Sequence, residues 1–380
     1  MNAEEKSSMG TQGQSTSVLH IVNKWGKGGV ERFIEGVAEC SCGRSIEHSV
    51  LSICTDIESS APFKAVYGPM SCGKGLVSLF KGSLYLGPFL KSHPFDVVHI
   101  HASNGSCFLF AAIAKSEGIP TRIVHSHNSS MQSGSGAVKQ VAHRLLRRAF
   151  LGNETHRLAC SSEAGRHLFA DNKFEIIPNG IEIKRFEFNS ENRRTLREEL
   201  GISEDCLMIL CIGSLIEAKN HMRSLAIFDS LRKNNPNSRL MILGEGPLRE
   251  KIEEGVKDRE MVDLVIMPGF VKDSERWLSA ADAVLFPSLH EGLPIALVEA
   301  QCNGLPVVCS DAVTREVCLS SECSFLSLQC DDGAWVKKLC SSKRDETGGA
   351  ARLVASLGFD RMETVERLFE LYEAKEGRRG

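Results

Sequence analysis

Short apolar runs alternate with amphipathic segments along most of this chain. The apolar runs have the length of buried strands and lie at 18–22, 49–54, 97–101, 121–124, 208–212, 239–243, 264–267, 283–286 and 307–309. Between them, apolar side chains recur at helical spacing in segments that include 76–90, 108–115, 136–151 and 191–200. Strands separated by helices are typical of parallel sheets, so the pattern predicts an α/β protein with doubly wound sheets.

The chain is long enough for two such sheets. It has 380 residues, of which 42% are hydrophobic and 24% charged, as in ordinary globular proteins. One hydrophobic core seldom serves so many residues, so two domains of similar size are expected. Residues 1–16 are polar and small, and we predict a disordered leader there.

Composition also indicates the cellular compartment in which the protein is expected and the kind of surface that it faces. The 14 cysteines show neither C-x-x-C pairs nor zinc-type Cys/His spacing, so we expect reduced thiols and a cytoplasmic protein. No apolar run is long enough to span a bilayer. Residues 1–185 hold 20 Lys and Arg against 15 Asp and Glu, and the remainder holds 25 against 33. This asymmetry suggests that the first half faces an anionic surface such as a membrane, although a modest charge excess is usually just a solvated face.

The stretch from Phe286 to Gly304 concentrates the candidate chemistry. It predicts a strand end, a turn and a helix from Pro294 to Gln301, ended by Gly304. Unpaired N–H groups at such a helix start can hold a diphosphate. Glu291 before the helix and Glu299 inside it can accept hydrogen bonds from the hydroxyls of a ribose and a hexose. The alternative is that both glutamates have only local structural roles.

Other candidate residues follow predicted strands. Gly28 and Gly29 come after the first strand, but without a G-x-G-x-x-G pattern they give little support to a nicotinamide site. His125 and His127 form an H-x-H pair at a strand end, and with no third ligand nearby we predict no metal. Lys219 is placed at the start of a helix, where it can meet phosphate oxygens or remain a plain surface lysine.

The spacing of Glu291 and Glu299 within PSLHEGLPIALVEA resembles the E-x7-E signature of the retaining family 4 glycosyltransferases, which use nucleotide sugars and have the two-domain GT-B fold. The GGVE loop and the IPNGI…RF phrase, at the entry to the second domain, are also similar to that family. The resemblance implies an N-terminal Rossmann-like domain over 17–185, a nucleotide-sugar domain over 186–355, and a C-terminal helix over 356–380 that returns to the first domain.

The resemblance also implies roles for individual residues. Glu299 would bind the ribose, while Glu291 and His127 would face the donor sugar as the catalytic residues. The implied donor-binding residues are Gly28, Gly29, Ser214, Lys219, Phe270, Val271, Gly292, Leu293, Pro294 and Glu299. Ser214 departs from the family, which has an arginine there, so Lys219 and the helix starts must suffice, Arg249 must substitute, or the donor is handled differently.

The expected function is therefore a metal-independent hexosyltransferase without a cofactor. Its donor would be a nucleoside diphosphate sugar, with UDP favoured. The sequence around SDAVTREV is similar to that of capsular and exopolysaccharide glycosyltransferases. This similarity implies a lipid-linked or glycan acceptor, peripheral membrane contact and no nucleic acid partner. Two alternatives stay open: a nucleotide-sugar epimerase of the same architecture, and a non-catalytic nucleotide-sugar-binding subunit.

Overall fold

The computed structural model describes residues 15–374, except 24, 27, 55–61, 71–75, 103 and 128–136. Most of the predicted leader therefore lies outside the described residues, and the first strand begins at Thr16. By their contacts the residues form two compact units, of which the first holds 1–125, 134–157 and 368–380, and the second holds 126–133 and 158–367.

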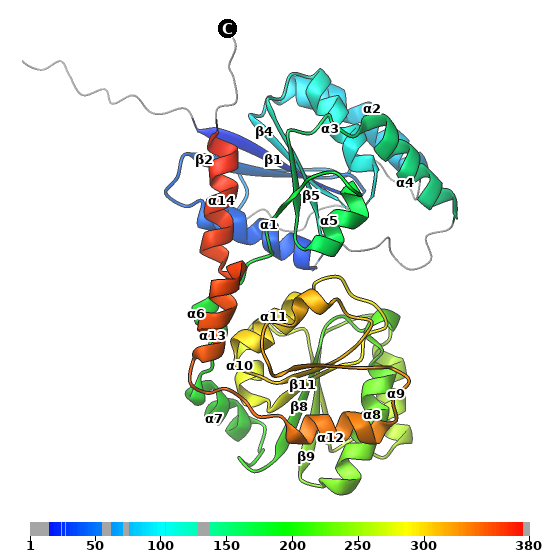
Figure 1. The fold of residues 1–380 in the computed structure, drawn as a ribbon, viewed down its shortest axis with the longest axis vertical. Helices are drawn as coiled ribbons and strands as arrows, with labels where there is room; N and C mark the ends of the chain where they lie inside the picture. Colours follow the sequence, from blue (N-terminus) through cyan, green and yellow to red (C-terminus); the bar gives the residue numbers. More distant parts are fainter. Residues whose placement is uncertain are drawn as a thin grey trace, which may run out of the picture. The chain divides into compact units, whose positions relative to one another are not determined.

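The first sheet has seven strands in the order β3-β2-β1-β4-β5-β6-β7. Its strands are β1 (Thr16–Val22), β2 (Ile46–Ser52), β3 (Ala65–Tyr67), β4 (Val97–Ala102), β5 (Thr121–Ser126), β6 (His156–Ala159) and β7 (Glu175–Ile176). β1 pairs in parallel with both β2 and β4. The helices along this part of the chain are α1 (Gly29–Cys40), α2 (Leu76–Ser92), α3 (Ser106–Ser116), α4 (Ala137–Phe150) and α5 (Ser162–Phe169). Helices α2, α3 and α4 lie together on one side of the sheet (Figure 1).

The second sheet has six strands in the order β10-β9-β8-β11-β12-β13, and its pairs are parallel. They are β8 (Leu207–Ile212), β9 (Ser238–Leu243), β10 (Val265–Gly269), β11 (Ala283–Phe286), β12 (Val307–Ser310) and β13 (Cys323–Leu326). β8 and β11 are neighbours at its centre, where the chain changes the direction in which it adds strands. Ligand sites of α/β sheets form at the carboxyl ends of strands at such a point.

Helices cover both sides of the second sheet (Figure 1). The longer ones are α7 (Ser190–Glu199), α8 (His221–Asn234), α9 (Arg249–Asp258), α10 (Ser274–Ala280), α11 (Ile295–Cys302) and α12 (Asp332–Ser341). Shorter turns are α6 (Ile183–Phe186), the 3₁₀ turns η1 (Glu217–Lys219) and η2 (Arg315–Val317), and α13 (Gly349–Val354). The core is continuous on both sides of the sheet, because Leu210 and Val284 point into one cluster while Ile209 and Leu285 point into the other.

The α/β prediction and its doubly wound sheets are confirmed, but three local predictions are wrong. The helix predicted to begin at Lys219 begins at His221, because Asn220 has a left-handed backbone (φ 54°) that separates it from η1. The pattern at 158–169 predicts a short helix with Ser162 as its cap, but the cap of α5 is Ser161, since Ser161 Oγ accepts from Ala164 N. The C-terminal helical segment is broken by a π turn, η3 (Ala355–Phe359), before α14 (Arg361–Glu373).

The two units also divide the chain differently from the domains expected from the sequence. Residues 158–185 group by contacts with the second unit, although the sequence predicted them in the first domain. The end of α14, from Leu368, groups with the first unit. Sequence pattern indicates where elements start and end, but not which elements they pack against.

Candidate functional site

The segment between β11 and α11 brings the two predicted glutamates into defined positions. β11 ends at Phe286, and α11 starts after Pro294, whose extended backbone makes it the N-cap. Glu291 lies in the loop, where its backbone bridges to Val313, and Glu299 lies inside α11 with 6% of its surface exposed. Gly304 follows the helix with φ +72°, as predicted for the residue that ends it.

Lys219 and Glu291 form an ion pair in this site. The distance from Lys219 Nζ to Glu291 Oε1 is 2.7 Å, and the two side chains are only 16% and 17% exposed. The ammonium also lies over the ring of Phe286, 4.6 Å from its centroid. A lysine from the β8–α8 loop thus meets a carboxylate from the β11–α11 loop at the carboxyl ends of the two central strands.

Two hydrogen bonds to backbone carbonyls hold these two loops together. Asn220 Nδ2 donates to Pro287 O at 3.1 Å, and Leu289 N donates to Ala218 O at 2.8 Å. The left-handed conformation of Asn220 therefore serves two purposes: it starts α8 and directs its amide to the neighbouring loop. Sequence reasoning missed Asn220, although an asparagine before a helical pattern is a usual signal for such a turn.

Two glycines allow two backbone segments to pack closely against each other and against the Lys219 side chain. Gly213 and Gly244 have φ values of +141° and +140°, which favour glycine. A Cβ on Gly213 would lie 2.9 Å from Lys219 Cε, and a Cβ on Gly244 would lie 2.0 Å from Gly213 O. The lysine side chain thus rests on a backbone surface that only glycines can form.

Ser214 occupies the position where the resemblance led us to expect an arginine, and it is exposed. Its carbonyl accepts from His221 Nε2 at 3.3 Å. Burial lowers the pKa of His221 to about 4, so this imidazole is neutral at pH 7. Arg249, considered as a substitute, donates to Met267 O at 3.1 Å and pairs with Glu253 at 2.8 Å. Arg249 is therefore held against the end of β10.

The segment after β10 carries the two residues expected near the nucleotide base. Gly269 has φ +87°, Phe270 is 40% exposed, and Val271 packs partly against the core of the second unit. An exposed aromatic ring next to a glycine turn offers a flat surface on which a base can stack.

In the glycine loop before α1, a carboxylate of the protein itself accepts hydrogen bonds from the backbone amides. Glu31 accepts from Gly26 N at 3.0 Å through one oxygen and from Gly28 N at 3.1 Å through the other. Gly28 is the N-cap of α1, and Gly29 is the first helical residue. Two amides of the loop are therefore used by a side chain that sequence reasoning had not singled out.

His127 directly follows β5 and is 7% exposed. Its Nδ1 lies 3.2 Å from Asn179 Oδ1, and since an amide oxygen only accepts, Nδ1 carries the proton. Burial lowers the pKa of His127 to about 4, with the Asn179 bond acting in the opposite direction. The ring is thus a neutral, oriented imidazole.

The described helices contain no segment long and apolar enough to cross a lipid bilayer.

Two sequence families match the two halves of the chain. Residues 27–185 match the family described as Glycosyltransferase Family 4, and residues 192–347 match Glycosyl transferases group 1.

Curated proteins with similar sequences are glycosyltransferases. The putative glycosyltransferase EpsF of Bacillus subtilis is 31% identical over 73% of this chain and 75% of its own length. The UDP-Gal:alpha-D-GlcNAc-diphosphoundecaprenol alpha-1,3-galactosyltransferase of Escherichia coli is 26% identical over 68% of this chain and 67% of its own.

Solved structures show the same fold. HepE of Anabaena, in complex with UDP, has a TM-score of 0.73 at 14% identity and covers 94% of this chain and 98% of its own. WaaG, a glycosyltransferase involved in lipopolysaccharide biosynthesis, has a TM-score of 0.70 at 18% identity and covers 94% of this chain and 100% of its own. The expected two-domain GT-B fold is confirmed.

Proposed function

This chain belongs to the family 4 glycosyltransferases and is an enzyme of glycan biosynthesis, and from that premise we propose that it transfers a hexose from a UDP-sugar to a lipid-linked glycan with retention of configuration. The uridine donor is supported by the Escherichia coli relative, a UDP-Gal galactosyltransferase, and by the HepE complex with UDP, and the lipid-linked acceptor is supported by the diphosphoundecaprenol substrate of that relative. The transfer would take place on the cytoplasmic face of the membrane.

The observation that carries this proposal is the contact between Lys219 and Glu291 at the carboxyl ends of β8 and β11. In the absence of donor, each charge neutralises the other. A bound diphosphate offers Lys219 a stronger anionic partner, and Glu291 is then released to accept hydrogen bonds from the hydroxyls of the transferred sugar. The ion pair is in this sense a resting state that the donor would replace.

The start of α11 would supply the remaining phosphate contacts. A helix leaves its first N–H groups without intrahelical partners and carries positive potential at that end. Gly292, Leu293 and Ile295 have N–H groups here, whereas Pro294 has none and can only shape the turn. Charge on the leaving diphosphate would be stabilised by these amides together with Lys219, without a metal.

Glu299 and His127 complete the proposed roles. Glu299, which lies more than one turn beyond the helix start, would accept hydrogen bonds from the ribose hydroxyls. His127 would contact the donor sugar as a neutral imidazole. Retention would follow from attack on the face that the leaving diphosphate occupied, with that diphosphate accepting the proton of the acceptor hydroxyl.

Helix α4 is the surface that we assign to the membrane. Val138, Val141 and Leu145 lie at helical spacing and are 69%, 53% and 61% exposed. Arg144 and Arg148 are exposed beside them. An exposed apolar stripe flanked by arginines suits the headgroup region of an anionic bilayer, which is where a lipid-linked acceptor is found.

Calorimetric titration with UDP, GDP and ADP tests the donor site. We expect UDP to bind best and Glu299→Gln to weaken it at least tenfold, while Glu370→Gln, an exposed glutamate on α14, leaves it unchanged. Incubation of a UDP-hexose with membrane extract then distinguishes transfer from its alternatives. Turnover without any acceptor would identify an epimerase, binding without turnover a non-catalytic subunit, and binding of no nucleotide would refute the site.

Flotation with vesicles tests the membrane surface separately. We expect the protein to float with vesicles containing anionic phospholipid and to lose this property with Leu145→Ser. Val262→Ser is the matched control, because Val262 is 62% exposed in the second unit. Equal flotation of the two variants would refute the assignment of α4.

A further inference from the structure

The first unit contains a cluster of buried histidines that the proposed transfer does not use. They are His20 on β1, His48 on β2, His99 and His101 on β4, and His125 on β5, all between 0% and 7% exposed. His20 is the register partner of His99. Since strand residues two apart share a face, His101 lies on the same face as these two.

Aromatic side chains cover the cluster. Tyr372 of α14 meets the ring of His99 edge-on with 5.8 Å between centroids, and Phe33 of α1 meets the ring of His125 with 5.4 Å between centroids. Buried imidazoles in such surroundings are costly unless their nitrogens find partners.

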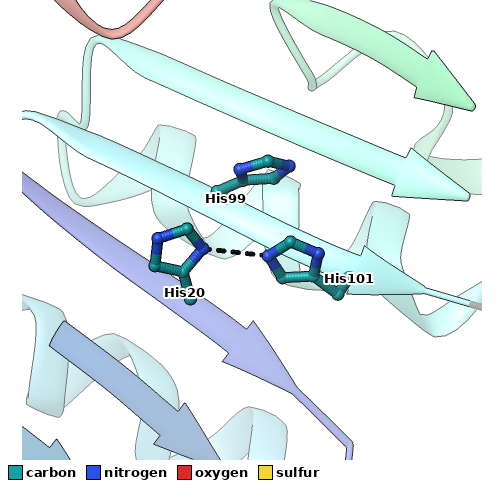
Figure 2. Close-up of side chains that lie close together, drawn as sticks. All are labelled: His20, His99 and His101. Atoms are coloured by element: carbon teal, nitrogen blue, oxygen red, sulfur yellow. Dashed lines mark hydrogen bonds between the residues drawn. The ribbon is translucent and has the colours of Figure 1, made fainter. Parts of the chain in front are cut away.

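The nitrogens of the cluster face one another. His20 Nδ1 lies 2.9 Å from His101 Nε2, and His20 Nε2 lies 2.9 Å from His48 Nδ1. Figure 2 shows the rings of His20 and His101 directed at each other, with His99, two residues before His101 on β4, close to both. One ring nitrogen from each of His20, His99 and His101 lies within 4.8 Å of those of the other two.

These spacings are close to what a transition-metal ion requires. Ligand nitrogens about 2.0–2.1 Å from a tetrahedral zinc ion are about 3.3 Å apart. Small changes of side-chain torsion would open the His20–His101 distance by a few tenths of an ångström and bring His99 nearer.

The other ring nitrogens have the partners that metal-bound histidines usually have. His99 Nδ1 lies 2.7 Å from the Tyr372 hydroxyl, while His99 Nε2, the nitrogen left for the ion, lies 3.3 Å from His125 Nδ1 and exchanges that contact for the ion on binding. His20 Nε2 donates to His48 Nδ1 in one of the two possible tautomers. Hydrogen bonds of this kind fix the orientation of a metal-binding imidazole and raise its basicity. The Tyr372 hydroxyl is hydrogen-bonded to His99 Nδ1, so it acts as a partner of that ring and not as a ligand.

We propose that His20, His99 and His101 bind one divalent first-row transition ion of the zinc type, with a structural role in the first unit. In the metal-free cluster one proton lies between His20 Nδ1 and His101 Nε2. On binding, the ring that holds this proton changes tautomer: His20 moves it to Nε2, which donates to His48 Nδ1 once His48 carries its own proton on Nε2, or His101 moves it to Nδ1. Both ligand nitrogens are then unprotonated, both rings stay neutral, and no proton is released. A water molecule fills the fourth position of the tetrahedron.

Such an ion connects parts of the chain that are far apart in sequence. It joins β1 to β4 directly, and through His99 and Tyr372 it strengthens the attachment of α14 to the sheet. For the H-x-H pair at 125 and 127 the sequence shows no third ligand. For His20, His99 and His101, in contrast, two neighbouring strands bring the three ligands together. The inference is independent of sugar transfer, because Lys219, Glu291 and Glu299 lie in the second unit and the histidine cluster lies in the first.

The test uses the full chain without a histidine tag, freed of metal with chelator and then titrated with Zn²⁺. We expect one ion per chain by elemental analysis and a melting temperature about 5–10 °C higher at zinc concentrations near a hundred times Kd. His101→Gln should abolish both effects. His93→Gln, which removes an exposed histidine of the same unit, should leave them unchanged.

If His101→Gln folds poorly, X-ray absorption spectroscopy of the wild type at the zinc edge still tests whether histidines bind the ion. For the wild type we expect nitrogen and oxygen ligands only, at about 2.0–2.1 Å, with the multiple scattering of at least three imidazoles. Fewer than 0.2 ions per chain, or equal stabilisation of both variants, would overturn the proposal and leave the cluster as a hydrogen-bonded stack without an ion. UDP binding should survive removal of the metal, so failure here is distinguishable from failure of the donor site.

Discussion

Replacing Lys219 by methionine tests how the donor site handles charge. The methionine keeps most of the aliphatic side chain that rests on Gly213 and Phe286 but removes the ammonium. A hydrogen bond to a charged group contributes about 1.5–3 kcal/mol. Part of that is already present in the unbound protein as the 2.7 Å contact to Glu291, which the donor has to replace. We therefore expect a net loss of about 1–2 kcal/mol, equivalent to UDP binding about 5- to 30-fold weaker.

Glu291→Gln should act in the opposite direction on binding. Without the carboxylate, Lys219 has no anionic competitor for the diphosphate, so UDP should bind as tightly as in the wild type or a few-fold more tightly. Transfer should nevertheless fall sharply, because the carboxylate that we propose to orient the sugar is gone. A structural role for the pair predicts instead that both variants weaken binding to a similar extent.

Calorimetry at constant ionic strength measures both variants, with thermal unfolding to confirm that they are folded. Lys233→Met is the matched control, since Lys233 on α8 also has a carboxylate partner, Asp229 at 2.9 Å, but is 66% exposed. It should change UDP affinity less than twofold. Binding by Lys219→Met within twofold of the wild type, or an equal loss in Lys233→Met, would refute the assignment of the diphosphate to Lys219.

Two further predictions concern stability. Gly244→Ala should lower the free energy of unfolding by about 3–5 kcal/mol, because its Cβ would lie 2.0 Å from Gly213 O at φ +140°. The control Gly201→Ala, at φ +65° with open space around it, should lower it by only about 1 kcal/mol. Equal midpoints of the two variants in guanidinium titrations would contradict this. Stability should also fall as the pH is lowered from about 6.5 to about 4, because burial holds the pKa of His127 and His221 near 4 and the unfolded chain binds protons first. The variant His221→Gln should reduce that slope, and an unchanged slope in denaturant titrations at pH 5 and pH 7 would contradict the reasoning.

Much of the second unit could be predicted from the sequence because local signals agree there. The apolar run at 283–286, the proline before α11 and the glycine after it each determine local structure through backbone chemistry. The positions of Glu291 and Glu299 relative to the helix start follow from those signals.

The partners of these residues could not be predicted in the same way. That Lys219 meets Glu291 depends on β8 and β11 being neighbours in the sheet, which strand-length patterns do not reveal. Nor does the sequence around Gly28 show that Glu31 occupies the loop amides. The histidine cluster escaped notice because its members come from four strands, and only strand order brings them together.

The hydrogen bond between His99 and Tyr372 spans 273 residues of chain and has a consequence for biosynthesis. Phe369 and Tyr372 are buried against the first sheet, so the hydrophobic core of the first unit stays incomplete until α14, which follows the whole second sheet in the chain, has been translated. Of the two sheets, the one that is synthesised earlier is thus completed later. A ribosome that stalls within the second unit would release a chain whose first unit exposes apolar surface, in a form that cellular proteases can recognise as unfinished.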